Sequence, residues 1–199
     1  MTNDFIDLSR KEKEQAFTRV WETFLNGDFS QRWEVAKYLP KFGDRAIAPL
    51  THLLANETTD LDLRCEAAHI LGQCQTPQAI FTLTETLNTE SEPEIITACT
   101  NALANMGKSA IPVLTEALAN PETRLAAVQA LAYLRTPEII TPLMNLVDDP
   151  KPEIRRTVIE ALSSFRHSQI MPVLISALQD TDPQVRQEAV MACGVRGKT

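Results

Sequence analysis

Three neighbouring side chains have the types and the spacing of a small chemical site: Cys65, Glu66 and His69. Residues three and four apart share one face of a helix, so these groups would stand together. A thiol, a carboxylate and an imidazole could bind a metal ion, or could hold the cysteine as a thiolate. The chain has three histidines, however, and none lies three or four residues from another, so no helix offers a two-histidine metal pair. We therefore predict no metal site.

Cysteine chemistry has one further candidate. Cys74 lies between Gly72 and Pro77, and this short stretch predicts a loop with an exposed thiol. We find no base placed beside it, so covalent chemistry would lack an activated nucleophile. None of the four cysteines forms a C-x-x-C pair, and the chain has neither a Gly-rich phosphate loop nor a G-x-S-x-G turn. We predict no catalytic residue and no cofactor that belongs to the chain.

The charge of the chain argues against nucleic acid as a partner. The 199 residues include 19 lysines and arginines against 26 aspartates and glutamates, which gives a net charge of -7. Residues 57–94 hold eight acidic side chains and one base, Arg64, and such a surface repels phosphate. No apolar run approaches the length of a membrane span, and the first residues lack a secretion signal. We expect a cytoplasmic protein with no membrane span.

A repeated pattern shows which elements must carry these side chains. Five leucines stand in similar apolar segments, at intervals of 33, 31, 29 and 31 residues: Leu50, Leu83, Leu114, Leu143 and Leu174. Each is followed four residues later by another apolar residue, which is one turn along the same helix face. Each segment therefore predicts the first helix of a repeating unit.

A second helix is predicted in each unit. Its markers are arginines at matching positions, replaced once by Ile96: Arg32, Arg64, Arg124, Arg155 and Arg186. Residues three and seven positions after this marker are apolar in every unit, and this spacing forms the stripe of an amphipathic helix. The chain is therefore expected to be a row of helix pairs.

Prolines and glycines mark the predicted helix ends. Proline is tolerated in the first turn of a helix, and glycine often ends one in the left-handed conformation. Pro49, Pro112, Pro142 and Pro172 would begin first helices, Pro93, Pro121, Pro152 and Pro183 would begin second helices, and Gly43, Gly72, Gly107 and Gly194 would end second helices. Asn120 and Asp182 are predicted to cap the second helices that they precede.

The predicted fold class is all-α, with about six helix pairs that bury a shared core only when stacked. We expect one repeat domain over residues 1–199. An atypical N-terminal capping pair occupies residues 1–46, with helices over 9–26 and 30–39, and repeats follow over about 47–78, 79–109, 110–138, 139–169 and 170–199. No further pair covers the last repeat, which predicts an interface or the seam of a longer protein.

The pattern of the second helices resembles HEAT repeats. It consists of the arginine, an apolar residue three positions later and a leucine seven positions later, and it is clearest in Val185–Ala189 after the turn Asp180–Pro183. The short period is similar to the subtype named for phycobilisome lyases, cyanobacterial proteins that attach or remove bilin chromophores. The resemblance implies a right-handed α-α superhelical solenoid over nearly the whole chain. It also implies that the arginines pair with acidic residues of the turns between helices, here Asp60, Asp148 or Asp149, and Asp180 or Asp182.

By analogy with this family, the second helices line a concave face. The columns expected there vary between repeats whereas the core columns recur, as on a recognition surface carried by a regular scaffold. We predict that a partner contacts Trp33, Lys37, His69, Asn101, Gln129, Tyr133, Arg156 and Glu160. Trp33 and Tyr133 are the best anchors, because exposed aromatic side chains contribute strongly to binding, although both could instead be tucked between repeats.

Two functions remain open. The first is a scaffold that binds a protein through the concave face or the C-terminal end, without catalysis or in support of another enzyme. The alternative follows from the resemblance alone: a bilin lyase or phycobilisome-associated chromophore-handling subunit, with bilin as a transferred ligand. Such a subunit needs cations for the two propionates of an open-chain tetrapyrrole, and the loose candidates are Arg155, Arg156 and Lys37.

Overall fold

The computed structural model describes residues 10–196, and every regular element in that range is helical. The α-helices are α1 (Arg10–Asn26), α2 (Phe29–Ala36), α3 (Asp44–Ala55), α4 (Leu61–Cys74), α5 (Pro77–Thr89), α6 (Pro93–Asn105), α7 (Ile111–Ala117), α8 (Arg124–Leu134), α9 (Ile140–Met144), α10 (Pro152–Ser163), α11 (Ile170–Ala177) and α12 (Pro183–Arg196). Short 3-10 helices precede or follow them at Leu39–Phe42, Gly107–Ala110 and Pro137–Ile139. The predicted all-α class is confirmed.

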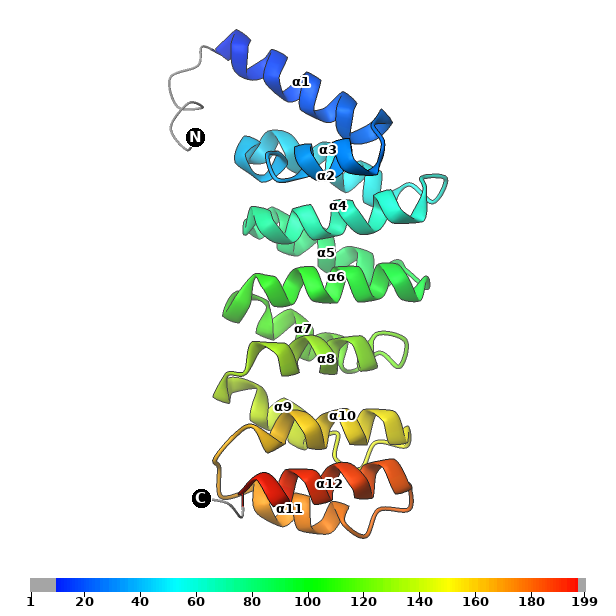
Figure 1. Cartoon of the computed structure of the whole chain (residues 1–199), viewed down its shortest axis with the longest axis vertical. Helices are drawn as coiled ribbons and strands as arrows, with labels where there is room; N and C mark the ends of the chain where they lie inside the picture. The colour runs from blue at the N-terminus through cyan, green and yellow to red at the C-terminus, as the bar shows by residue number, and fades with distance from the viewer. Residues whose placement is uncertain (1–9, 197–199) are drawn as a thin grey trace. The chain divides into compact units, whose positions relative to one another are not determined.

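The helices form two compact units that divide between Ala102 and Leu103, within α6. In the first unit, α3 packs against α4, and α5 contacts both. In the second unit, α7 packs against α8 and α11 against α12, while α10 contacts both α8 and α12. Figure 1 shows α8, α10 and α12 side by side in that order. Each unit is thus built from successive helix pairs, as the repeat pattern predicts.

The recurring apolar columns form the core. The five leucines that mark the first helices are fully buried, and so are the leucines seven positions after the markers of the second helices: Leu39, Leu71, Leu103, Leu131 and Leu162. Burial of these side chains supplies the main driving force for stacking, because a single pair exposes its apolar stripe to water. Within residues 10–196, no helix has both the length and the apolar character needed to cross a membrane.

Most of the predicted second-helix starts are confirmed. Pro93, Pro152 and Pro183 are the first residues of α6, α10 and α12. Asp182 caps α12, because its carboxylate accepts the backbone N–H groups of Gln184 at 2.8 Å and Val185 at 3.2 Å.

Two predicted helix starts and one predicted cap are wrong. Pro49 lies inside α3, which already begins at Asp44. Pro121 and Asn120 lie in a turn before α8, which begins at Arg124. The Thr123 hydroxyl donates to the Ala117 carbonyl at 2.7 Å and holds this turn closed. The Asn120 side chain therefore accepts the N–H of Glu122 within the turn and does not cap the helix.

The first pair also differs from its predicted bounds. Asp28 caps α2 in a capping box with Gln31, and α2 ends at Ala36 before a 3-10 turn that contains Pro40. The continuous helix predicted over 30–39 is therefore broken. Residue 9, the predicted start of the first helix, lies outside the described residues.

The glycines divide into two kinds. Gly43 and Gly107 have φ angles of 56° and 71° and lie between helices, as predicted for glycines that end them. Gly72 and Gly194 lie within α4 and α12, so the prediction of caps there is wrong. At Gly72 the cause is packing, since an added Cβ would lie 2.8 Å from the backbone of Ala102.

An arginine ladder joins consecutive helix pairs within each unit, and we define it as Arg64, Arg124 and Arg155 with their acidic partners. Arg155 donates to both carboxylate oxygens of Asp180, at 2.8 and 2.7 Å, and to the Asp149 carbonyl at 2.7 Å. Arg124 makes one contact with the Asp149 carboxylate, at 3.0 Å, and donates to the Leu118 carbonyl of its own turn at 2.7 Å. Each guanidinium thus closes its own turn and also binds the carboxylate of the following turn.

The ladder corrects the predicted pairing. Asp149 and Asp180 do bind ladder arginines, but each binds the arginine of the preceding helix pair and not the one of its own turn. Arg64 likewise pairs with Glu90 of the following turn and not with Asp60. Asp60 instead accepts the Asp62 N–H at the start of α4. Glu90 has replaced aspartate at the ladder position, and its other carboxylate oxygen accepts two backbone N–H groups of its turn.

The ladder stops where its carboxylate is missing. The position that would serve Arg32 is occupied by Thr58, and the Arg32 Nε is buried without a hydrogen-bond partner among the described residues. Where Ile96 replaces the arginine, the matching turn residue is Leu118, so neither half of the ion pair is present in the sequence. At this step both halves of the ion pair are absent, whereas at Arg32 only the carboxylate is absent.

Candidate functional site

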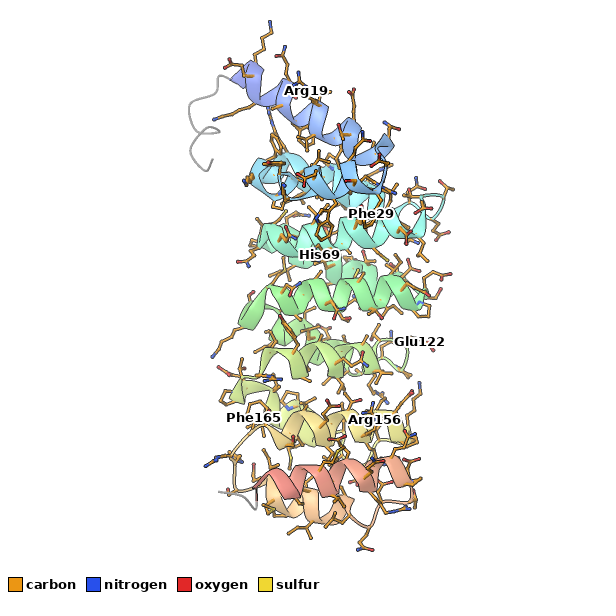
Figure 2. All side chains as sticks on the ribbon, viewed as in Figure 1. Arg19, Phe29, His69, Glu122, Arg156 and Phe165 are labelled. Atoms are coloured by element: carbon orange, nitrogen blue, oxygen red, sulfur yellow. The ribbon has the colours of Figure 1, made fainter. Side chains whose placement is uncertain are left out.

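The eight predicted partner contacts all lie on second helices or at their ends. Trp33, Lys37, His69 and Asn101 belong to the first unit, and Gln129, Tyr133, Arg156 and Glu160 belong to the second. Seven are exposed, and Arg156 is half-buried. Trp33 and Tyr133 are exposed by 70% and 71%, so neither is tucked between repeats. Figure 2 shows His69 on α4 and Arg156 on α10.

A groove in the second unit collects four of these residues. It has a volume of about 620 Å³ and lies between α8 and α10. Its lining residues are Gln129, Ala132, Tyr133, Arg135, Arg156, Thr157, Glu160, Ala161 and Ser164. We call this site the α8–α10 groove. Its wall combines an exposed aromatic ring, two guanidinium groups and one carboxylate, which are groups that recognise polypeptide segments.

The charged groups of the groove are only loosely paired. Arg156 Nη1 lies 3.5 Å from the Glu160 carboxylate, at the long limit of a hydrogen bond, and both side chains are partly exposed. Glu188 on α12 adds a second carboxylate nearby. Burial raises the pKa of Glu188, repulsion from Glu160 raises it further, and Arg156 opposes both effects. Arg156 thus stands between two carboxylates and can exchange one of them for a ligand carboxylate.

Arg135 is a groove residue that sequence reasoning missed. It ends α8 in the left-handed conformation, with φ of 48°, and the next residues are Thr136 and Pro137. Gln75 ends α4 with φ of 50° before Thr76 and Pro77. The repeated Thr-Pro step, at 76–77 and 136–137, was the signal that could have located this turn. Because the backbone reverses there, Arg135 leaves the helical columns and lines the groove.

The first unit offers a smaller hollow. It has a volume of about 410 Å³, lies along α6 and includes Asn101 among its lining residues. Lys37 is engaged with Glu34 at 2.7 Å, and the His69 ring nitrogen bonds the Gln73 side chain at 2.8 Å. The predicted residues of this unit are therefore exposed on second helices, and Asn101 lines this hollow.

The cysteine cluster has no activated thiol. Burial raises the pKa of Cys65, and nearby carboxylates raise it further, so this thiol stays protonated at neutral pH. The pKa of buried Cys99 is raised to about 12. Among residues 10–196, no group of three or more His, Cys, Asp and Glu side chains is placed to hold a metal ion.

The prediction of a looped, exposed Cys74 is wrong. Cys74 is the last residue of α4 and is half-buried. Its thiol donates to the Ile70 carbonyl one helical turn earlier, with a sulfur–oxygen distance of 3.4 Å. Burial raises its pKa, which leaves no nucleophile at this position.

Comparison with protein families matches two overlapping stretches of the chain, residues 55–122 and 111–194, to HEAT repeats. No curated protein sequence matches the chain.

Several solved structures share the fold. The complex of CpcE and CpcF of phycocyanin lyase from Nostoc sp. PCC7120 is 20% identical, with a TM-score of 0.50, over 88% of this chain and 74% of that chain. YibA from Escherichia coli is 18% identical, with a TM-score of 0.58, over 96% of this chain and 76% of that chain. A chain in the structure of microtubule plus-end tracking by XMAP215, CLIP-170 and EB1 is 15% identical, with a TM-score of 0.53, over 88% of each chain. At these identities the likeness establishes the fold alone.

Proposed function

Because the chain belongs to the HEAT repeat family, we propose that it is a scaffold that binds a protein partner through the exposed face of its second helices. On this proposal it is cytoplasmic and either has no catalysis of its own or assists another enzyme. The observation that carries the proposal is the α8–α10 groove, where Tyr133 and Arg156 stand beside a recess of about 620 Å³.

The composition of the groove supports binding of a polypeptide. A tyrosine ring exposed by 71% offers a large contact area at little cost in conformational entropy. Arginine and tyrosine are also the residue types that dominate measured binding energies when a partner excludes water from them. The core beneath the groove is closely packed, since Leu131 and Leu162 are fully buried. The helices that carry the anchors are therefore positioned before a partner arrives.

The charges of the groove favour an acidic partner segment. Arg135 has no ion-pair partner in the described part of the chain, and Arg156 makes a weak contact with Glu160 and has the Glu188 carboxylate nearby. A carboxylate on the partner would find two guanidinium groups in the groove, and an apolar side chain beside that carboxylate would pack on Tyr133. We infer that the bound segment combines an acidic residue with a neighbouring apolar one.

Replacement of Tyr133 or Arg156 by alanine is expected to weaken binding while leaving the fold intact. A partner retained by the immobilised chain from extracts of its source cells would be purified, and its Kd measured by titration calorimetry. Each variant should raise the Kd about tenfold or more, because central aromatic and arginine contacts carry most of the binding energy. Phe81→Ala is the matched control, since Phe81 is 59% exposed but lies on the first helix α5. Equal losses for Phe81→Ala and the groove variants would exclude the groove as the site.

A second candidate function is the handling of a bilin as a transferred ligand. It is favoured by the fold likeness to the phycocyanin lyase complex. The candidate cations support it poorly, because Arg155 is engaged with Asp180 and two backbone carbonyls, and Lys37 is engaged with Glu34. We place protein binding first for this reason.

Titration of the purified chain with an open-chain tetrapyrrole separates the two functions. We expect the absorption spectrum of the pigment to stay unchanged, because two of the three candidate cations, Arg155 and Lys37, are engaged in ion pairs and the third, Arg156, contacts Glu160. A saturable shift of the absorption band that is lost in Arg156→Ala would instead establish the bilin function.

A further inference from the structure

The last helix pair ends in an apolar surface that nothing in the described chain covers. It is formed by Met171 and Ile175 on α11 and by Val190 and Arg186 on α12, and we call it the end face. Ile175 and Val190 are exposed by 56% and 61%. Exposed aliphatic side chains are typical of interaction sites when they form one patch with a polar neighbour.

The same positions are covered in the preceding helix pair. Ile159 on α10 is the counterpart of Val190 and is only 1% exposed, because α12 packs against α10. Ile140 on α9 is the counterpart of Met171 and is 7% exposed. The end face therefore consists of side chains that the repeat normally places against a following helix pair.

Arg186 lies beside the apolar patch and lacks the carboxylate partner that the ladder arginines have among the described residues. It occupies the position of the ladder arginines and, like Arg155, donates to carbonyls of its own turn, here Asp180 at 2.8 Å and Thr181 at 2.9 Å. Arg155 also binds the carboxylate of the next turn, whereas Arg186 has no carboxylate partner among the described residues. The end face thus presents half of a ladder ion pair next to an apolar surface.

We propose that the end face binds a HEAT-like helix pair of a partner protein, with an Asp or Glu in the turn between its two helices that pairs with Arg186. The partner pair stacks on α11 and α12 and covers Ile175 and Val190. A second copy of this chain fits less well, because the position in its first pair that corresponds to the ladder carboxylate is Asn26. This site is separate from the α8–α10 groove and does not depend on the function proposed for it.

Site-specific photo-crosslinking tests this proposal in the full-length chain. Ile175 is replaced by the photoreactive amino acid benzoylphenylalanine, and the protein is irradiated in extracts of its source cells. We expect a crosslinked product whose partner peptide, identified by mass spectrometry, lies in a helical-repeat protein beside a turn that contains Asp or Glu. The same amino acid at Phe81, which is also exposed, is the matched control and should not give this product.

Substitutions then test the ion pair. Arg186→Glu and Val190→Asp should each lower the crosslinked yield about tenfold, because truncation or reversal of a desolvated interface contact has effects of this size. The Val190 side chain is exposed, so Val190→Asp should keep a melting temperature close to that of the wild-type chain. Arg186→Glu also loses the bonds to the Asp180 and Thr181 carbonyls and should melt at a slightly lower temperature, with the helical circular dichroism signal retained. Tyr133→Ala should leave this product unaffected. Substitution of the partner's turn carboxylate by arginine should restore the yield with Arg186→Glu.

Three outcomes would overturn the proposal. The first is a yield no higher than at the Phe81 position. The second is a crosslink confined to other copies of this chain or to a partner without helix pairs. The third is a product that persists in Arg186→Glu, which would mean that apolar contact alone accounts for it.

Discussion

The substitution Arg155→Ala is expected to lower the free energy of unfolding of the second unit by about 3 kcal/mol, the usual cost of removing one partner from a largely buried ion pair. The side chains of Arg155 and Asp180 are 12% and 13% exposed. Alanine would leave the Asp180 carboxylate without its two charge-assisted hydrogen bonds and the Asp149 carbonyl without its donor. Urea denaturation followed by far-UV circular dichroism measures the loss.

A double-mutant cycle separates this ion pair from the other contacts of Arg155. Asp180→Asn alone removes the charge while keeping the size of the side chain, and Arg155→Ala with Asp180→Asn removes both partners. We expect the double variant to be more stable than the sum of the single losses predicts, because neither charge is then left unpaired. Arg156→Ala is the matched control, since its ion pair is long and exposed and should contribute little. Strict additivity would show that the ladder pair contributes no coupling.

The ion pair between Arg155 and Asp180 also predicts how the stability of the chain depends on pH. The hydrogen bonds from Arg155 hold the pKa of Asp180 below its ordinary value, and burial of the carboxyl opposes this effect. A carboxyl whose pKa is lower in the folded state stabilises the fold above its unfolded pKa, which is about 4, and loses that contribution as the pH falls through the folded value. The wild-type chain should therefore lose stability below about pH 4, and Asp180→Asn should lack that part of the loss.

The sequence allowed the helix pairs and their core to be predicted because both depend on short-range periodicity. Buried leucines recur at fixed positions, and a spacing of three, four and seven residues places them on one helix face without knowledge of the rest of the fold. The partner of Arg64 could not be found this way. The resemblance suggested Asp60 in its own turn, but the guanidinium reaches Glu90 of the following turn. That choice depends on how two repeats stack, which a local pattern does not contain.

The candidate site was predictable to a similar extent. Columns of exposed residues on second helices located Gln129, Tyr133, Arg156 and Glu160, all of which line the α8–α10 groove. They did not locate Arg135, because a residue with a positive φ leaves the column that helical periodicity defines. The sequence also could not show that the groove lies in the second unit, since hollows depend on side-chain volumes across two neighbouring helices.

A further test uses Gly72, where packing and helix propensity make opposite predictions. Gly72→Ala is expected to lower the free energy of unfolding of the first unit by about 2 kcal/mol, as overpacking of a tight core does. The new Cβ would lie 2.8 Å from the Cα, Cβ and carbonyl oxygen of Ala102 on α6. Because these atoms include backbone, the steric overlap can be relieved only if α6 moves away from α4. Urea denaturation measures the loss.

Gly194→Ala provides the matched control, because Gly194 is also helical but an added Cβ there would meet nothing within 4 Å. Alanine is favoured over glycine within a helix by up to about 1 kcal/mol, so this variant should be unchanged or slightly more stable. Opposite signs for the two substitutions would show that α4 and α6 approach too closely at Gly72 for any side chain. A stabilising effect at both positions would mean that helix propensity outweighs contact, and that the spacing of these two helices does not depend on the glycine.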